Sequence, residues 1–463
     1  MNAAPEKPDR AVPDVWECAR ILRAGRSAAL AAALALLAVR SFAAPQVPSR
    51  AELNGLLGDP SQEQWGALAR FDDTLTRRDF EVRLDRVFDP ARGLHPYITF
   101  FEGGVAIFSG PERTAGPISV VRLANLARAE RPLPVTFRTP YQLRHRFGIP
   151  PGQPLLGVRI AIDPADIGGE WAKMEDRSVD FAGFGRINEG DLNLVVGRLL
   201  RERLTALGAT VFLVRDRAEP VLIPRPADLS AVTGEVLADR PWMLPESFQH
   251  LAGVLPAGNP RRLHVAEGLL LTKTIETRAR VALERRLFVP DITVVLQHNA
   301  TADSTEGRLN AINRNIFFVH GAYSPSELRE PEQRFRLLTK LLEDTEPIEA
   351  EVAHAIALRF RAATGFPPVL SGNSSNTRLV LSNDPYVVAR NLAFNREHDG
   401  PVVVTEPYFM NQAETLSRLL AGDFLGQRRI AGKYRISIYR EYADCVAEGL
   451  VDAYRPGQLA AVR

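Results

Sequence analysis

Four side chains that can bind a metal or transfer a proton lie at the ends of predicted strands and helices in this 463-residue chain. Asp166 comes just after an apolar strand, His298 ends a second strand and Glu406 ends a third. A fourth residue, Glu189, opens a predicted helix. Because ligands bind beyond the carboxyl ends of the strands in a parallel sheet, we expect these four side chains to meet at one edge.

Three carboxylates and one imidazole at a common edge suit a hydrolytic zinc site. Such a site has three protein ligands, an open position for water and a nearby carboxylate that acts as a base. Asn299 follows His298 directly and could support a ligand by hydrogen bonding. Each residue alone also has an ordinary role; Glu189, for example, could simply complement a helix N-terminus. The hypothesis of a zinc site therefore depends on whether the four side chains meet at one edge of the sheet.

The elements that must position these residues alternate between strand and helix. A strand at 158–162, a helix at 191–207 and a strand at 210–215 form one such unit, with Gly208 just past the helix. A connection of this length joins parallel strands. The pattern therefore predicts an α/β fold, with a mainly parallel sheet flanked by helices.

The same alternation continues to the C-terminus. Further strands are predicted at 292–297, 315–320 and 402–405, and helices at 272–287, 345–362 (closing at Gly365), 384–397 and 439–454. These elements extend the sheet and cover both of its faces.

The rest of the chain divides into an N-terminal part, a linker and an insertion. Residues 45–131 predict a small accessory α+β domain, with helices at 64–88 and a hairpin around Glu102. Six prolines mark a linker at 132–155. The main domain is expected at 156–460. Its stretch 217–263 contains seven prolines and reads as an insertion, which could cover the site as a lid.

Residues 1–43 predict a secretory signal segment. Arginines 20, 23 and 26 precede a nearly all-apolar run at 27–39, which is too short to span a bilayer, and small residues at 41 and 43 suggest cleavage near Ala43. No cysteine follows the apolar run, so a lipid anchor is not expected. We therefore expect a periplasmic or secreted protein without a stable membrane span after cleavage.

Composition excludes several other classes of protein. Apolar residues make up 45% and charged residues 24%, which excludes a disordered chain and a multi-span membrane protein. The formal net charge is only +2, so nucleic acid is not an expected partner. The chain has two cysteines, Cys18 and Cys445, and no CxxC motif, so disulfide scaffolds and cysteine zinc sites are excluded.

Four segments resemble, in order, the motifs of the zinc-dependent N-acetylmuramoyl-L-alanine amidases, which cleave bacterial peptidoglycan. They are residues 162–169 (IDPADIGG), 189–194 (EGDLNL), 294–300 (VVLQHNA) and 403–407 (VVTEP). The family patterns read roughly I-D-P-G-H-G-G, E-x-D-L-N-L, S-I-H-A-N-A and V-E. The resemblance covers about residues 156–455 and implies the amidase fold, with peptidoglycan as substrate.

The resemblance also implies roles for the four residues. Glu189 and His298 match metal ligands, and Glu406 matches the catalytic glutamate. The third ligand of the family is a histidine, but this chain has Asp166 there and Ala165 in place of the glycine before it. An aspartate can bind zinc through oxygen, although such a site would hold Zn²⁺ less tightly or favour another divalent ion. Two hypotheses stay open: a working amidase, or a degenerate relative that binds cell-wall peptidoglycan without cutting it.

Other residues are weaker candidates. Arg278 resembles a helical arginine of the family, and Arg278 and Asn299 could contact substrate, but an ion pair explains Arg278 equally well. Three further histidines, His264, His320 and His354, could supply a nitrogen ligand, although a structural role is expected for each. A zinc carboxypeptidase would need a His/Glu/His set with different spacing, which the sequence does not show.

Overall fold

The computed structural model describes residues 45–125, 131–244, 248, 259–301, 307–369 and 376–455. The predicted signal segment 1–43 lies outside the described residues. Within the described part of the chain, no helix is both long enough and apolar enough to cross a membrane. Cys445 is buried there as a free thiol.

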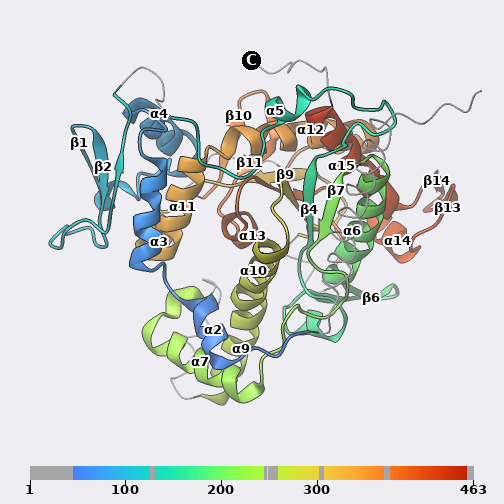
Figure 1. Ribbon diagram of the computed structural model, residues 1–463. Helices are drawn as coiled ribbons and strands as arrows, with labels where there is room; N and C mark the ends of the chain where they lie inside the picture. Colours follow the sequence, from blue (N-terminus) through green and yellow to red (C-terminus); the bar gives the residue numbers. More distant parts are fainter. Residues whose placement is uncertain are drawn as a thin grey trace, which may run out of the picture. The chain divides into compact units, whose positions relative to one another are not determined.

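The centre of the fold is a seven-stranded mixed sheet in the order β10-β11-β9-β12-β8-β4-β7 (Figure 1). Its strands are β4 (Arg159–Pro164), β7 (Thr210–Leu213), β8 (Ile292–Leu296), β9 (Ile316–Val319), β10 (Arg378–Leu381), β11 (Asp384–Ala389) and β12 (Val402–Glu406). Strands β7, β4, β8 and β12 are consecutive neighbours and parallel to one another, as are β9 and β11. Only β9–β12 and β10–β11 are antiparallel. The prediction of a mainly parallel α/β sheet is confirmed.

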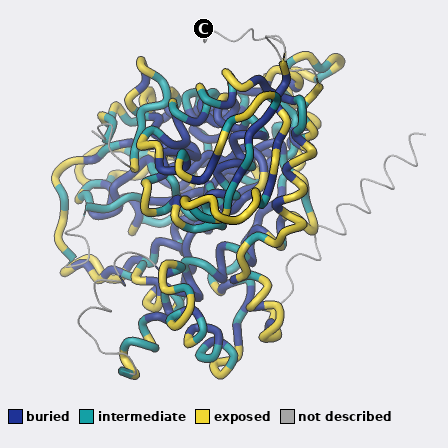
Figure 2. Tube along the Cα trace, turned by 90° about the vertical axis from the view of Figure 1, so that its left-hand side faces the viewer, coloured by how far each residue is buried: buried dark blue, intermediate teal, exposed yellow. Residues whose placement is uncertain are grey.

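Helices pack on both faces of this sheet. Helices α6 (Glu189–Ala206), α12 (Glu346–Thr364) and α15 (Ile438–Tyr454) share one apolar core with strand residues such as Ile162 and Val294. Residues that point the other way, such as Val295 and Val404, pack near α13 (Ala393–Glu397). Helix α10 (Glu276–Leu287) lies on this second face, where Arg280 reaches Asp163. The central strands β8, β9 and β12 are buried at nearly every position, in keeping with the apolar runs that predicted them, and Figure 2 shows buried chain concentrated in the interior of the molecule.

Most predicted helices are present within a few residues of their expected limits. Gly208 follows α6 with φ +93°, and Gly365 ends α12 with φ +66°, so each has the left-handed conformation that glycine adopts at low cost. The predicted helix at 384–397 is wrong. Its first part is β11, because the β-branched Val387 and Val388 pair in parallel with β9 and are fully buried; only α13 is helical.

The N-terminal part contains helices and a three-stranded sheet. Its elements are α2 (Arg50–Leu57), α3 (Gln62–Gly66), η2 (Ala67–Phe71), α4 (Arg77–Arg83), η3 (Leu84–Phe88), η4 (His95–Tyr97), β1 (Ile98–Phe101), β2 (Gly104–Ile107) and β3 (Ser119–Arg122). The hairpin predicted around Glu102 is confirmed by pairing of β1 with β2. Most buried apolar side chains from α3 to β3 form one cluster with leucines of α11 (Pro331–Glu343).

Helix α7 (Pro226–Asp239) and the turn η6 (Pro241–Met243) lie inside the predicted insertion. Helices α2, α7 and α9 (Pro260–Leu269) form a separate apolar cluster with the π-helical segment η7 (Leu270–Ile275), which runs into α10. The remaining elements are α5 (Pro140–Arg144), η5 (Gly169–Lys173), β5 (Ser178–Phe181), β6 (Gly185–Asn188), η9 (Glu327–Arg329), α14 (Ala413–Leu420), β13 (Arg428–Ile430) and β14 (Lys433–Arg435).

Candidate active site

The structure brings the four predicted residues to the carboxyl ends of three neighbouring parallel strands. Asp166 lies two residues past β4, His298 two residues past β8, and Glu406 is the last residue of β12. Glu189 is the first residue of α6, and its Oε1 accepts a hydrogen bond of 3.1 Å from the backbone N–H of His298. The side chains of Asp166 and Glu189 are 1% and 2% exposed. Two ionisable groups are thus buried together at this edge.

The loop that carries Asp166 packs closely against the start of α6. Asp166 has φ +57°, and its backbone oxygen accepts a hydrogen bond of 2.9 Å from the Arg280 guanidinium. A Cβ atom at Gly190 would lie 2.4 Å from the carbonyl carbon of Ile167, so only glycine fits there. This close approach fixes the separation between Asp166 and Glu189.

Asn193 determines which ring nitrogen of His298 carries the proton. The Asn193 Nδ2 donates to the backbone oxygen of Ala165 at 3.0 Å, which leaves its Oδ1 to accept from His298 Nδ1 at 2.8 Å. Burial lowers the pKa of His298 to about 3, so the ring is neutral. With the proton on Nδ1, the lone pair of Nε2 is available to a metal. Asn193 stands four residues after Glu189 in the helix, which is the signal that could have identified it from the sequence.

Tyr442 of α15 joins the two strands that carry His298 and Glu406. Its hydroxyl lies 2.9 Å from the backbone oxygen of Gln297 and 2.8 Å from that of Thr405. These two residues directly precede His298 and Glu406 in the sequence. One buried hydroxyl therefore holds both strand ends in register.

Two cations that the sequence patterns did not identify contact the acidic side chains. Arg177 approaches Asp166 Oδ1 at 3.5 Å and Glu189 Oε2 at 3.6 Å. Lys273 lies 3.1 Å from Glu175 and 3.7 Å from Asp166. Burial opposes ionisation of Asp166, but the charges of Arg177 and Lys273 outweigh it and hold the Asp166 pKa at about 2. The cluster therefore contains both negatively and positively charged side chains.

The other carboxyl groups of the cluster hold protons more tightly. Burial, together with the charge of Asp166, raises the pKa of Glu189 well above its usual value, although Arg177 opposes this effect. Burial raises the pKa of Glu406 to about 7, against the charges of Arg177 and Arg390. The pKa values of Glu189 and Glu406 thus lie well above that of Asp166. Such a separation is typical of acid–base sites, where different surroundings keep one carboxyl group protonated and another ionised.

The donor atoms fit a divalent cation, but they are not gathered around one point. Both oxygens of Asp166 and Oε2 of Glu189 are buried without a hydrogen-bond partner in the described part of the chain. Protons on Glu189 or Glu175, or a bound cation, would satisfy Asp166. The carboxylates of Asp166, Glu175, Glu189 and Glu406 share this edge with the cations Arg177 and Lys273, and Arg390 also acts on Glu406.

The assignment of Asp166, Glu189 and His298 as metal ligands stays a prediction. Among the described residues, no group of three or more His, Cys, Asp or Glu side chains is arranged to hold a metal ion. Asp166 and Glu189 both face the guanidinium of Arg177, which acts as their counter-ion.

A second ion cluster lies beneath the first strand end, on the second face of the sheet. The imidazole of His398 is fully buried, with its nitrogens 3.1 Å from Asp163 Oδ2 and 3.1 Å from Glu284 Oε2. Burial disfavours the charged ring, but Glu284 and Asp163 outweigh it and raise the His398 pKa to about 10. Arg280 completes the cluster by donating to Asp163 at 3.0 Å. This cluster anchors the strand that leads to Asp166.

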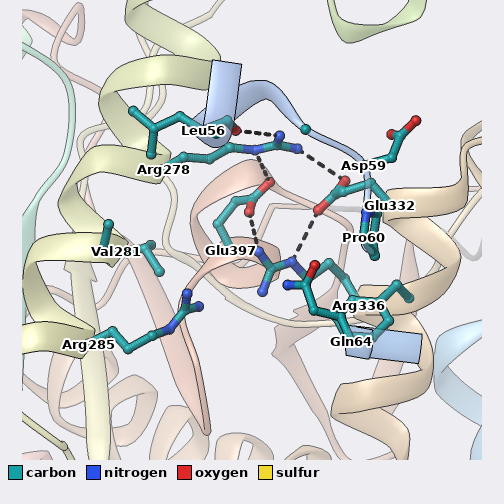
Figure 3. A pocket seen from close by; sticks show the side chains of 14 residues that line it. Leu56, Asp59, Pro60, Gln64, Arg278, Val281, Arg285, Glu332, Arg336 and Glu397 are labelled. Atoms are coloured by element: carbon teal, nitrogen blue, oxygen red, sulfur yellow. Dashed lines mark hydrogen bonds and ion pairs between the residues drawn. The ribbon is translucent and has the colours of Figure 1, made fainter. Parts of the chain in front are cut away.

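Arg278 lies outside the site, in a polar pocket of about 160 Å³ between α2, α10, α11 and α13 (Figure 3). Its guanidinium pairs with Glu397 at 3.1 Å and Glu332 at 3.4 Å, and donates to the backbone oxygen of Leu56. Arg280, two residues later, is the arginine that contacts the Asp166 loop. Of the two roles considered for Arg278, a substrate contact and an ion pair, its contacts agree with the ion pair.

The remaining candidates have local partners. The Asn299 Oδ1 accepts from the backbone N–H of Ala300 at 2.7 Å, so it stabilises its own turn. His320 is buried against the Tyr323 hydroxyl at 2.7 Å, and His354 lies 2.5 Å from Asp384. His264 is exposed beside Glu267. Each of these three histidines thus pairs with a residue outside the cluster around Asp166, in keeping with the structural role expected for it.

Comparison with known proteins gives structural likenesses only at low identity. The apo N-acetylmuramyl-L-alanine amidase of Mycobacterium abscessus is 15% identical, with 64% of this chain and 99% of that chain covered at a TM-score of 0.34. The CwlD amidase of Clostridioides difficile, in complex with the GerS lipoprotein, is 14% identical, with 64% and 98% covered and a TM-score of 0.34. The catalytic domain of the CwlV amidase of Paenibacillus polymyxa is 13% identical, with 63% and 96% covered and a TM-score of 0.33. No protein-family model and no curated protein sequence matches the chain.

Proposed function

We propose that this chain is a metal-dependent hydrolase that cleaves the amide between N-acetylmuramic acid and L-alanine in peptidoglycan. One observation carries the proposal: the Nε2 of a neutral His298, both oxygens of Asp166 and Oε2 of Glu189, which accept no hydrogen bond among the described residues, lie at the strand edge that also carries Glu406. The order of the four sequence motifs supports the choice of substrate. A secreted or periplasmic location agrees with the predicted signal segment.

Asp166, Glu189 and His298 would hold the metal, as Zn²⁺ or another divalent ion. When bound, such an ion supplies an acidic water molecule and polarises the substrate carbonyl. His298 binds as a neutral ligand because Asn193 keeps its proton on Nδ1. Two carboxylates and one imidazole favour a harder ion than a site with two histidines does, so Mn²⁺ is a reasonable competitor of Zn²⁺.

Glu406 acts as the general base. Its carboxylate accepts a proton from the attacking water and delivers it to the departing amine of L-alanine. Burial raises the pKa of Glu406 to about 7 in the metal-free site, which favours proton uptake by this carboxylate. Tyr442 holds the strand end from which Glu406 projects.

A second candidate function follows from Arg177. Since this guanidinium already lies beside Asp166 and Glu189, the cluster has a counter-ion without any metal. A chain in this state could bind peptidoglycan at the same edge without cutting it. The two functions differ in whether the purified protein takes up a divalent ion.

The experiment that separates them uses the mature chain purified without affinity metals. Bound metal is measured after incubation with Zn²⁺ or Mn²⁺ and gel filtration, and muropeptides released from isolated sacculi are identified by mass spectrometry. Near-stoichiometric metal and release of free stem peptides with an L-alanine amino terminus support the hydrolase. Co-sedimentation with sacculi, without metal and without release, supports the binding protein instead.

A further inference from the structure

Arg177 contacts the two carboxylates that are proposed as metal ligands. The guanidinium lies 3.5 Å from Asp166 Oδ1 and 3.6 Å from Glu189 Oε2, so it faces the oxygens to which a metal would bind. Lys273, the other cation of the cluster, is closest to Glu175, which is not a proposed ligand. Arg177 is thus the cation that competes most directly for the ligand set.

The β5–β6 hairpin delivers Arg177 to this position. Arg177 directly precedes β5 and Glu189 directly follows β6, and Ser178 pairs with Asn188 at the base of the hairpin. The backbone N–H of Glu189 donates to the backbone oxygen of Arg177 at 3.0 Å, which fixes the two residues opposite each other. The hairpin therefore positions the arginine by its backbone.

The guanidinium is held by charge and not by a closed set of hydrogen bonds. Its contacts of 3.5 and 3.6 Å are longer than good hydrogen bonds, and its Nε has no hydrogen-bond partner in the described part of the chain. Its side chain is 42% exposed, whereas the carboxylates are buried. Arg280 shows the opposite case: it is buried and donates to Asp163 and to the backbone oxygens of Pro164 and Asp166. Part of the Arg177 side chain thus reaches solvent although its Nε is buried, whereas the side chains of Asp166 and Glu189 are almost fully buried.

We infer that Arg177 is an exchangeable counter-ion of the site. It neutralises Asp166 and Glu189 while no metal is bound, and its guanidinium moves into solvent when a divalent ion takes its place. This inference rests on the proposed function, because it assumes that the same carboxylates bind metal. It has two consequences: loss of the arginine charge strengthens metal binding relative to the parent chain, and it destabilises the metal-free chain.

The test compares the mature parent chain with Arg177→Met, which keeps the apolar stem and removes the charge. The matched control is Arg186→Met on the same hairpin, where Arg186 and Asp180 are both exposed and 3.9 Å apart. Zn²⁺ affinity is measured by competition with a chromophoric chelator, and melting temperatures are measured with EDTA and with excess Zn²⁺. We expect Arg177→Met to bind Zn²⁺ at least about tenfold more tightly, to melt lower than the parent in EDTA, and to gain more from Zn²⁺. Arg186→Met should behave as the parent does.

Two results of the affinity measurement overturn the inference, and only one of them also overturns the proposed function. If the parent binds Zn²⁺ and Arg177→Met binds it equally or less tightly, Arg177 does not compete with metal, while the proposed function stands. If neither protein binds a divalent ion, both statements fail. Should Arg177→Met not fold in EDTA, Arg177→Gln is used as well. Refolding of either variant by Zn²⁺ supports exchange, and failure of both to fold even with Zn²⁺ shows that the arginine is a permanent structural cation.

Discussion

His298 Nδ1 donates a hydrogen bond of 2.8 Å to Asn193 Oδ1, and this contact decides which ring nitrogen is available at the site. The Asn193 amide cannot turn around without losing its second bond, because its Nδ2 donates to the backbone oxygen of Ala165. The same side chain therefore links the Asp166 loop, the first turn of α6 and the end of β8.

Replacement of Asn193 by alanine should weaken metal binding about 10- to 100-fold, because the ligating histidine loses the partner that orients it. Asn315→Ala is the matched control, since Asn315 is also fully buried but bonds to Thr364 near the amino end of β9. Both variants should melt below the parent, and only Asn193→Ala should change metal affinity in the chelator competition. An equal metal affinity for Asn193→Ala and the parent would contradict the assigned role.

Asp166 is expected to be a metal ligand of lower affinity than a histidine. Asp166→His should restore the ligand set that the sequence motif implies, and should raise Zn²⁺ affinity and the cleavage rate together. Asp166→Ala should lose most of the bound metal. Metal analysis after gel filtration checks both variants. Full metal occupancy in Asp166→Ala would show that this carboxylate is not a ligand.

Tyr442→Phe should slow cleavage and lower the unfolding free energy by about 1–3 kcal/mol, because two buried backbone oxygens lose the hydroxyl shared between them. Tyr454→Phe offers a close control, since the Tyr454 hydroxyl is equally buried but has no hydrogen-bond partner among the described residues. Chemical denaturation and steady-state rates would be compared for the two variants. A similar small loss of stability in both would indicate that Tyr442 acts by packing alone.

The sequence predicted those parts of the fold whose signal is local. Apolar runs identified the buried strands β4, β8 and β12, and glycines 208 and 365 marked the ends of α6 and α12. Strand β11 was missed because its pairing with β9 is a long-range contact, and its residues also fit a helical pattern. The positions of Asp166, Glu189, His298 and Glu406 followed from one rule about strand ends.

The supporting residues could not be predicted in the same way. Tyr442 is 145 residues from Gln297 in the sequence, and no spacing rule connects them. Arg177 reaches the carboxylates only because the β5–β6 hairpin returns the chain to Glu189. The sequence motif drew attention to Arg278, but Arg278 and Arg280 lie on one helix, and only packing decides that Arg280 faces the Asp166 loop.

The stability of the protein should fall at high pH because of His398. Its folded pKa of about 10 lies above the unfolded value of about 6.5, so its contribution is fully present below pH 6.5 and is lost as the pH rises through 10. His398→Gln removes one partner of a buried ion cluster and should cost about 3–5 kcal/mol at pH 7. The difference in unfolding free energy between the parent and this variant should shrink between pH 7 and 10. A constant difference over that range would contradict a charged His398.

The role of Glu406 is the central claim of the proposed mechanism, and Glu406→Gln tests it most directly. The substitution keeps the shape of the side chain and removes the proton acceptor. Release of stem peptides from sacculi and metal content are measured on the same preparations of parent and variant. We predict that metal content stays near the parent value while amide cleavage falls by about 100-fold or more, the usual share of general-base catalysis. Loss of the metal in Glu406→Gln, or cleavage at the parent rate, would contradict the account.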